Sequence, residues 1–281
     1  INAYHLGFRY GPMINACGRL DNAANVVKLM TTSNMEVIEE LSSSELCKVT
    51  LVRNSADGKK YVRREYNCDK SALFEKLRDT GSDNFAKTYV IMQNGGKTTT
   101  IDEYIEGDTL LYLLENDKFL ESDIPRLAVW LVYAIGILHK NGIVHGDIKP
   151  ANIIICPDGS LKLIDFGVSR LVGEDGKNYF GTLGYAAPEQ FVAKDHDFRT
   201  DIYSLGVTLQ RASEITGYEG YIKKIYEKCA NCEPEKRFQS APEILEAIVR
   251  HNRVKKALLT VGTVFSVVFL ISLIAFLISL F

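Results

Sequence analysis

The residues best suited to chemistry lie within residues 144–167. The run begins VHGDIKPANIII and ends LKLIDFG. It holds an acid, a lysine, an amide and a second acid at short spacings: Asp147, Lys149, Asn152 and Asp165. A carboxylate can orient a hydroxyl and accept its proton, and a lysine places a point charge on a phosphate. Amide and carboxylate oxygens are ligands that suit Mg²⁺. Together these residue types indicate phosphoryl transfer.

The segments upstream predict a small β-rich lobe that would cover these residues. Three stretches enriched in Val, Ile, Thr and Tyr are expected to be strands: residues 35–41, 48–54 and 59–66. Residues 69–78 suit a short helix with Asp69 as its N-cap. Residues 87–104 contain two more strand-like runs around a turn at Asn94.

After Gly107 the apolar spacing changes to a helical period. Apolar residues recur at intervals of three and four, and they predict helices at residues 108–116, 123–140, about 200–213, 218–230 and 240–250. Two short apolar strands, Ile153 to Ile155 and Leu161 to Ile164, are expected on either side of the Asp158-Gly159 turn. The predicted fold class is therefore α+β, with a small lobe at about 35–103 and a large lobe at about 107–250.

In this framework residues 35–250 resemble a eukaryotic-type Ser/Thr protein kinase domain, of the membrane-anchored kind found in bacteria. The resemblance rests on HGDIKPAN, DFG, GTLGYAAPE and DIYSLGV, which occur in the family's order. It implies a two-lobed protein-kinase-like fold, with a small antiparallel β lobe and a helical lobe. It also implies ATP and Mg²⁺ as cofactors and a protein substrate with a Ser or Thr acceptor.

The resemblance also implies a role for each catalytic residue. Asp147 resembles the carboxylate that accepts the substrate's hydroxyl proton, and Lys149 would contact the transferred phosphate. Asn152 and Asp165 would hold Mg²⁺. Thr182 matches a threonine typical of Ser/Thr kinases, which hydrogen-bonds toward the catalytic Asp and Lys.

Five further residues have structural roles in the same pattern. We expect His145 to support the catalytic loop and Phe166 to pack under the helix of the small lobe. Glu189 and Arg237 resemble a buried ion pair that anchors the helical lobe. Asp201 resembles a residue that braces the catalytic loop from the helix below it.

The nucleotide would lie between the two lobes. By resemblance, the adenine is expected between Val49 and Val62 on one side and Ile154 on the other. The hinge backbone from Glu103 to Ile105 would contact its edge.

The loop over the phosphates departs from the family pattern. Ser42, Ser44 and Cys47 stand where the family has three glycines. Glycine lets the backbone approach phosphates closely. The two serines could still offer hydroxyl and backbone N–H donors, whereas Cys47 adds bulk. We expect the affinity for ATP to be reduced.

Arg64 occupies the position of the family's phosphate-binding lysine. Arginine keeps the positive charge, but its planar fork is larger than an ammonium group. Its expected partner is Glu75 on the predicted short helix. Lys60 and Lys48 could each replace the missing lysine, but both are better interpreted as solvated surface residues.

Regulation by phosphorylation is expected to differ as well. Gly146 stands where many kinases have the arginine that receives a phosphate. Control through residues 168–186 is therefore less expected, although Ser169 and Tyr179 remain possible acceptors. Residues 201–237 are short for the family, so a helix that often docks partners is expected to be trimmed or missing.

The two ends of the sequence carry separate predictions. Residues 257–281 contain no charge and no proline, and a helix of this length reaches about 37 Å, enough to cross a hydrocarbon core of about 30 Å. The basic residues of 251–256 would keep the kinase-like part in the cytoplasm, on a cell membrane crossed once. The alternative is a hydrophobic interaction helix. Residues 1–34 are expected to be a poorly ordered extension or a mis-called start.

Composition excludes some other classes. The net charge of −2 gives no support for nucleic-acid binding. Cys229 and Cys232 form a lone CxxC, for which reduced thiols are favoured over a structural zinc.

Three functions remain: an active membrane-anchored kinase, a membrane-anchored pseudokinase that binds nucleotide or acts as a scaffold, and a small-molecule phosphotransferase of related fold. The GTLGYAAPE run disfavours the third.

Overall fold

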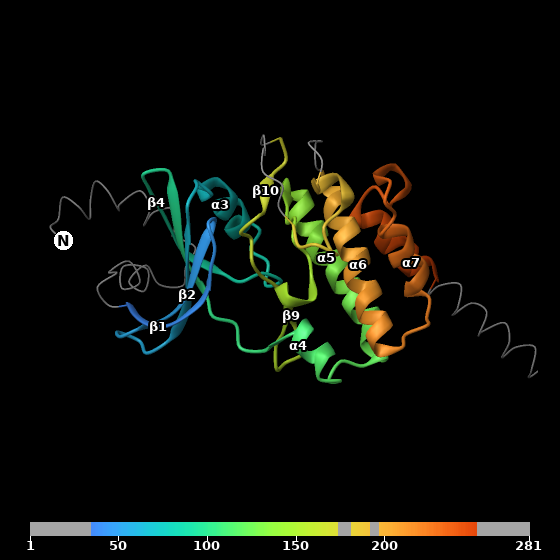
Figure 1. The fold of residues 1–281 in the computed structure, drawn as a ribbon, viewed down its shortest axis with the longest axis horizontal. Helices are drawn as coiled ribbons and strands as arrows, with labels where there is room; N and C mark the ends of the chain where they lie inside the picture. The colour runs from blue at the N-terminus through green and yellow to red at the C-terminus, as the bar shows by residue number, and fades with distance from the viewer. Residues whose placement is uncertain (1–34, 174–180, 192–196, 252–281) are drawn as a thin grey trace, which may run out of the picture.

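The computed structural model describes residues 35–173, 181–191 and 197–251. A β-sheet with one helix forms one lobe, and helices form the other (Figure 1). The chain passes from the sheet to the helices after residue 103, which agrees with the predicted lobe boundary.

The small lobe is built on a five-stranded antiparallel sheet in the order β1-β2-β3-β5-β4. Its strands are β1 (Met35–Ser43), β2 (Cys47–Asn54), β3 (Lys60–Tyr66), β4 (Thr88–Asn94) and β5 (Lys97–Glu103). One face buries a small apolar cluster that includes Val52, Tyr61 and Ile101. All five strands lie where the sequence predicts them, because alternating β-branched and aromatic residues suit a half-buried sheet.

The single described helix of this lobe is α3 (Ser71–Asp79). Leu73, Phe74 and Leu77 form its buried stripe at helical spacing. Tyr66 of β3 packs against Phe74, with ring centroids 5.3 Å apart. The predicted N-cap, Asp69, instead lies just before the helix and accepts a hydrogen bond from the backbone of Ser71 at 2.9 Å.

The large lobe is helical (Figure 1). Its helices include α4 (Leu110–Glu115), α5 (Ile124–Lys140), α6 (Phe198–Thr216) and α7 (Ile222–Cys229). Short 3₁₀ turns lie between them or follow them, at Glu121–Asp123, Pro150–Asn152, Pro188–Phe191 and Pro234–Lys236. Residues 241–251 form the last described helix turns. This final helix lies against α5, where a Cβ on Gly136 would come within 3.4 Å of Ala241.

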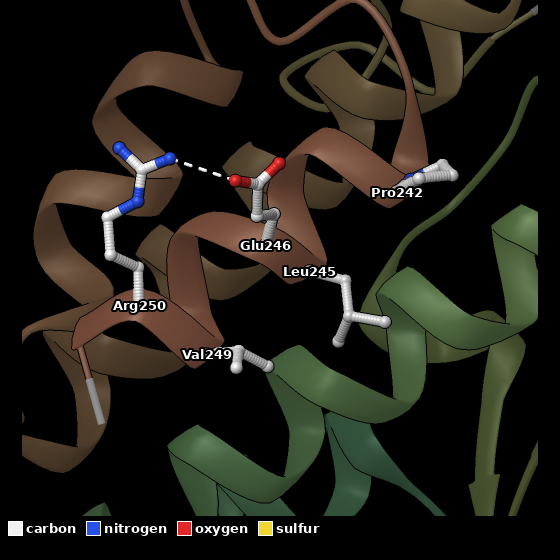
Figure 2. Close-up of a pocket in the computed structure, with 5 residues that line it drawn as sticks. All are labelled: Pro242, Leu245, Glu246, Val249 and Arg250. Carbon is white, nitrogen blue, oxygen red and sulfur yellow. Dashed lines mark hydrogen bonds and ion pairs between the residues drawn. The ribbon is translucent and has the colours of Figure 1, made fainter. Parts of the chain in front are cut away.

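A groove lies along that final helix. It is lined by Pro242, Leu245, Glu246, Val249 and Arg250. Leu245 and Val249 point toward a neighbouring helix, whereas Arg250 pairs with Glu246 at 2.8 Å (Figure 2).

Short strands position the loops between the lobes. They are β6 (Asp108–Thr109), β7 (Ile143–Val144), β8 (Ile153–Ile155), β9 (Leu161–Leu163) and β10 (Arg170–Leu171). β6, β8 and β9 form one small sheet, and β7 pairs with β10. Asp147 and Asn152 lie between β7 and β8, and Asp165 comes two residues after β9.

The structural ion pair expected in the large lobe is present. Arg237 Nη1 lies 2.6 Å from Glu189 Oε1, and Arg237 Nη2 donates to Glu189 Oε2 at 2.8 Å. Between Asp201 and Arg237 the structure has the rest of α6, then α7 and one 3₁₀ turn. The shortening relative to the family stays a prediction. Cys229 is buried and Cys232 exposed, and both are free thiols.

Two predicted segments lie outside the described residues, namely the N-terminal extension 1–34 and the apolar segment 257–281. Within the described ranges, no helix is long and apolar enough to cross a membrane. Tyr179 also lies outside these ranges, whereas Ser169 is buried and donates to the carbonyl of His145 at 2.8 Å.

Candidate active site

The loop that carries Asp147 is fixed from below by a buried carboxylate. Asp201 of α6 accepts hydrogen bonds from the backbone N–H of His145 at 2.9 Å and of Gly146 at 2.8 Å. His139 of α5 lies 3.0 Å from the same carboxylate. Burial opposes the charge of Asp201, but the contact with His139 and the loop N–H groups outweighs it and lowers its pKa. The predicted brace is therefore present.

Three predicted catalytic residues form one hydrogen-bonded cluster. Lys149 Nζ donates to Asp147 Oδ2 at 2.6 Å and to Thr182 Oγ1 at 2.6 Å. Thr182 Oγ1 donates in turn to Asp147 Oδ1 at 2.7 Å. The structure thus brings together residues that lie 35 positions apart in the chain.

The charge state of Asp147 follows from this cluster. Burial alone would raise its pKa, but hydrogen bonds from Lys149 and Thr182 outweigh burial, and the pKa lies below its ordinary value. The carboxylate is therefore ionised at neutral pH and can accept a proton.

His145 supports the loop, as predicted. Its Nδ1 accepts the backbone N–H of Asp147 at 3.3 Å, and its Nε2 lies 3.2 Å from the carbonyl of Ile164, to which it donates. Its ring contacts Phe166, with centroids 4.9 Å apart. Phe166 lines a small cavity together with Phe74 of α3, which agrees with its predicted packing under that helix.

Asn152 and Asp165 provide a partial cation site. Asn152 Nδ2 donates to the backbone carbonyl of Asp147 at 2.9 Å, which leaves the amide oxygen to bind a cation. Asp165 has a left-handed backbone (φ 67°), and its Oδ1 accepts the N–H of Gly167 at 3.2 Å. No group of three or more His, Cys, Asp or Glu side chains suited to a metal occurs in the described part of the chain. Two hard oxygen donors nevertheless fit Mg²⁺, which commonly takes its other ligands from phosphates and water.

The predicted pairing of Arg64 with Glu75 is wrong. Arg64 Nη1 instead lies 2.6 Å from Asp102 Oδ2 on β5, and Thr100 Oγ1 donates to the same oxygen at 2.8 Å. Glu75 is exposed on α3. The reason is geometric, because the buried stripe of α3 is Leu73, Phe74 and Leu77, and Glu75 projects elsewhere.

Sequence analysis missed Asp102 as a site residue. The available signal was an acid in the strand TTTIDE, two residues from Thr100 and therefore on the same face of β5. Only the pairing of β5 with β3 shows that this face also carries Arg64.

The loop that is predicted to lie over the nucleotide satisfies several of its own hydrogen-bonding groups. Ser44 Oγ accepts the backbone N–H groups of Leu46 at 3.3 Å and Cys47 at 3.1 Å, and it donates to the carbonyl of Cys47 at 3.1 Å. The hydroxyl of Ser44, which is predicted to contact phosphate, is thus engaged in hydrogen bonds within the loop. Ser42 is exposed. Cys47 is buried, and its burial raises the pKa of the thiol to about 11.

The amino-acid sequence was compared with known protein families and curated proteins. Residues 35–219 match the protein kinase domain. The chain belongs to the protein kinase family. A probable serine/threonine-protein kinase of Clostridium acetobutylicum is 29% identical over 238 residues, which cover 69% of this chain and 36% of that protein.

Other relatives support the eukaryotic-type Ser/Thr branch of the kinases. Serine/threonine-protein kinase cds1 of Schizosaccharomyces pombe is 30% identical over 67% of this chain and 46% of its own length. Serine/threonine-protein kinase PknB of Mycolicibacterium smegmatis is 34% identical over 41% of this chain and 20% of its own length. The chain therefore spans less than half the length of these curated relatives.

The residues predicted to contact the adenine come from both lobes. Val62 is buried, whereas Val49, Ile105 and Ile154 are half-buried. Glu103 at the hinge pairs with Lys162 of β9 at 2.7 Å, which ties the hinge to the large lobe.

Neither alternative lysine replaces Arg64 in this kinase. Lys48 pairs with Glu40 at 2.7 Å on the exposed side of the sheet, and Lys60 lies over the ring of Tyr104. Both are surface residues, as the sequence indicates.

Gln190 is a further residue that sequence analysis missed. Its Nε2 donates to the carbonyl of Gly146 at 3.0 Å, and its Oε1 accepts the N–H of Ala187 at 2.8 Å. Gly146 adopts a left-handed backbone (φ 81°), which favours glycine. Gln190 therefore links the catalytic loop to the AAPE segment without an arginine or a phosphate.

Proposed function

We propose that this kinase domain transfers the γ-phosphoryl group of ATP to a Ser or Thr hydroxyl of a protein substrate. The observation that carries the proposal is the cluster of Asp147, Lys149 and Thr182, which is already hydrogen-bonded and has an ionised acid. Relatives named as serine/threonine-protein kinases support the same class of acceptor.

Each residue has a defined part in the proposed reaction. Asp147 orients the acceptor hydroxyl and takes its proton as the oxygen attacks phosphorus. Lys149 stabilises negative charge on the transferred group through its positive ammonium. The contact with Asp147 holds that ammonium in place. Thr182 keeps the acid and the lysine in register.

Asn152 and Asp165 would hold Mg²⁺ through their side-chain oxygens. When bound, Mg²⁺ neutralises charge on the phosphates and helps to orient them. Asn152 also donates to Asp147 Oδ2 at 3.1 Å, so the residue assigned to the cation orients the catalytic acid as well.

The proposal is tested by phosphate incorporation. The full chain, purified in detergent, is incubated with labelled ATP, Mg²⁺ and a mixture of Ser/Thr peptides. We expect incorporation that falls about 100-fold or more in Asp147→Asn. Incorporation that persists unchanged in this variant would indicate a contaminating kinase, and ATP binding without any incorporation would refute the proposal.

A second candidate function is a pseudokinase that binds nucleotide or serves as a scaffold. Two observations favour it: Ser44 occupies N–H groups of the phosphate loop, and Arg64 replaces the expected lysine. Arg64→Lys separates the two candidates. A large gain in phosphate incorporation would indicate that Arg64 limits an active enzyme, whereas measurable ATP binding with no incorporation in either form would favour the pseudokinase.

We also propose that residues 257–281 anchor the chain in the cell membrane, with the kinase domain in the cytoplasm. The support is the uncharged, proline-free composition of that segment and the basic residues at 251–256. Membrane fractions are washed with high salt and then with detergent. Release by detergent alone is expected, and release by salt alone would refute a spanning helix.

A further inference from the structure

Arg64 and Asp102 lie on one face of the small-lobe sheet. Arg64 of β3 is paired in register with Thr100 of β5, and Val62 is paired with Asp102. Because side chains alternate along a strand, Val62 and Arg64 share a face with Thr100 and Asp102. This face belongs to the proposed nucleotide site, since Arg64, Asp102 and Asp165 line one small cavity.

The contact between these residues is buried and charge-assisted. The side chains of Arg64 and Asp102 are 12% and 3% exposed, and the N–O distance is 2.6 Å. Burial opposes the charge of Arg64, but Asp102, Tyr66 and Asp165 together raise its pKa above the ordinary value. Arg64 is therefore fully protonated, and removing either partner would leave an uncompensated buried charge.

Helix α3 offers no competing acid. Its buried positions are Leu73, Phe74 and Leu77. Its two acidic residues, Glu75 and Asp79, are both exposed. Asp102 on the sheet therefore pairs with Arg64, whereas the family resemblance assigns this pairing to an acid on the helix.

We infer that Asp102 is a positioning residue that holds Arg64 toward the phosphates of the nucleotide, in place of an acid on α3. This inference rests on the proposed ATP-dependent function. Adjacent strands of one sheet cannot separate without breaking their backbone hydrogen bonds, so the contact between Arg64 and Asp102 is fixed within the sheet. Arg64 is thus held by an acid of β5 and not by an acid of α3.

The guanidinium keeps donors for a ligand. Only Nη1 of Arg64 is bonded to Asp102 in the described part of the chain. Asp102 Oδ1 is buried and has no hydrogen-bond partner among the described residues. The adjoining cavity measures about 10 Å³, enough for about one water, which would satisfy this oxygen.

The experiment measures ATP affinity on the full chain in detergent, with titration of a fluorescent ATP analogue and competition by ATP. In Asp102→Asn the side chain keeps its shape but loses its charge, and we expect Kd for ATP to rise about tenfold. Thr100→Val removes only the hydroxyl that orients Asp102, and a rise of about threefold is expected. Asp79→Asn is the matched control for the loss of an acid, and its Kd is expected to stay within twofold of the original.

A double-mutant cycle distinguishes positioning from general stability. Arg64→Gln and Asp102→Asn are combined, and the double variant is expected to bind ATP no more weakly than Arg64→Gln alone, because Asp102 acts through Arg64. Fully additive losses would overturn the inference. So would a loss in Glu75→Gln that equals or exceeds the loss in Asp102→Asn.

The outcomes remain informative if one variant is unstable or the enzyme is inactive. Circular dichroism checks that each variant is folded, and Thr100→Val tests the same contact if Asp102→Asn does not fold. An unchanged Kd in Thr100→Val would then overturn the inference. Phosphate incorporation is measured in parallel, so ATP binding that depends on Asp102 without any transfer would refute the proposed activity and leave this inference intact.

Discussion

Ser44 lies in the loop that is predicted to cover the nucleotide phosphates, and its hydroxyl forms hydrogen bonds within that loop. Its Oγ accepts the N–H groups of Leu46 and Cys47, which would otherwise be available to a ligand. Replacing it with glycine frees both donors and lets the backbone approach a phosphate. We expect Ser44→Gly to lower Kd for ATP by about threefold, the equivalent of one modest hydrogen bond.

Titration of a fluorescent ATP analogue measures this change. Ser43→Gly is the matched control, because Ser43 is exposed and makes no side-chain hydrogen bond within the described residues. An equal fall in Kd for ATP in Ser43→Gly would show that backbone freedom alone, and not the release of N–H donors, controls the affinity.

His145 predicts a pH dependence of stability. Burial lowers its pKa below the ordinary value of 6.5, although the carboxylates of Asp201, Asp147 and Asp165 act in the opposite direction. The unfolded chain therefore binds a proton more readily than the folded chain. The stabilising contribution of neutral His145 is present above about pH 6.5 and is lost as pH falls below that value.

The free energy of unfolding of the full chain and of His145→Gln is compared between pH 5 and pH 7.5. We expect the original chain to be the more stable at pH 7.5 and its advantage to shrink toward pH 5, because an imidazolium cannot accept the N–H of Asp147. A constant difference across this range would contradict the prediction.

At the scale of elements, α6 holds the catalytic loop through Asp201. Its carboxylate is fully buried and binds two consecutive loop N–H groups together with His139. Asp201→Asn replaces one carboxylate oxygen with an NH₂ group, which would face an N–H group that now donates to Asp201. We expect it to destabilise the protein by about 2–4 kcal/mol and to reduce phosphate incorporation.

Ser213→Ala on the same helix provides the control. Ser213 Oγ is buried but has no hydrogen-bond partner among the described residues, so its removal loses no bond. The free energy of unfolding, measured by thermal unfolding, should change by less than about 1 kcal/mol in this variant. Comparable losses in the two variants would mean that α6 is sensitive to any buried substitution.

The boundaries of the elements were predictable to within a few residues. The prediction of a helix at residues 123–140 agrees with α5 (Ile124–Lys140), because its apolar period is long and its end is marked by Asn141-Gly142. The predicted helix at 108–116 is shortened to α4 (Leu110–Glu115), since Asp108 and Thr109 pair with β8. That pairing joins residues more than forty positions apart and has no local signal.

At the scale of the whole molecule, the Glu189–Arg237 pair joins the AAPE segment to the end of the helical lobe. The side chain of Arg237 is 0% exposed and forms a bidentate contact with Glu189. Arg237→Met would remove the cation that binds the Glu189 carboxylate at two points, and we expect the free energy of unfolding to fall by about 3–5 kcal/mol. Thermal unfolding measures this loss.

Arg250→Met is the control for that measurement. Arg250 pairs with Glu246 one helical turn away, and both side chains are largely exposed. An exposed pair at this spacing contributes about 0.5 kcal/mol or less. If the two variants lose similar stability, the buried pair is not an anchor of the lobe.

The sequence by itself determined the lobes, the order of the strands and helices, and the catalytic group Asp147, Lys149, Asn152 and Asp165. These properties follow from local periodicity and from residue types at short spacings, which are visible in one stretch of chain. It also identified Arg64 as the departure at the nucleotide site.

Only the tertiary structure decided what Arg64 contacts and what Ser44 does. Glu75 was the expected partner because it lies on the expected helix, but the rotation of α3 turns it outward, and the pairing of β3 with β5 brings Asp102 to the site. The side-chain partner of a buried charge depends on helix orientation and on strand register between segments distant in the chain. Neither quantity is encoded in the residues next to Arg64, and both are set by the packing of the whole lobe.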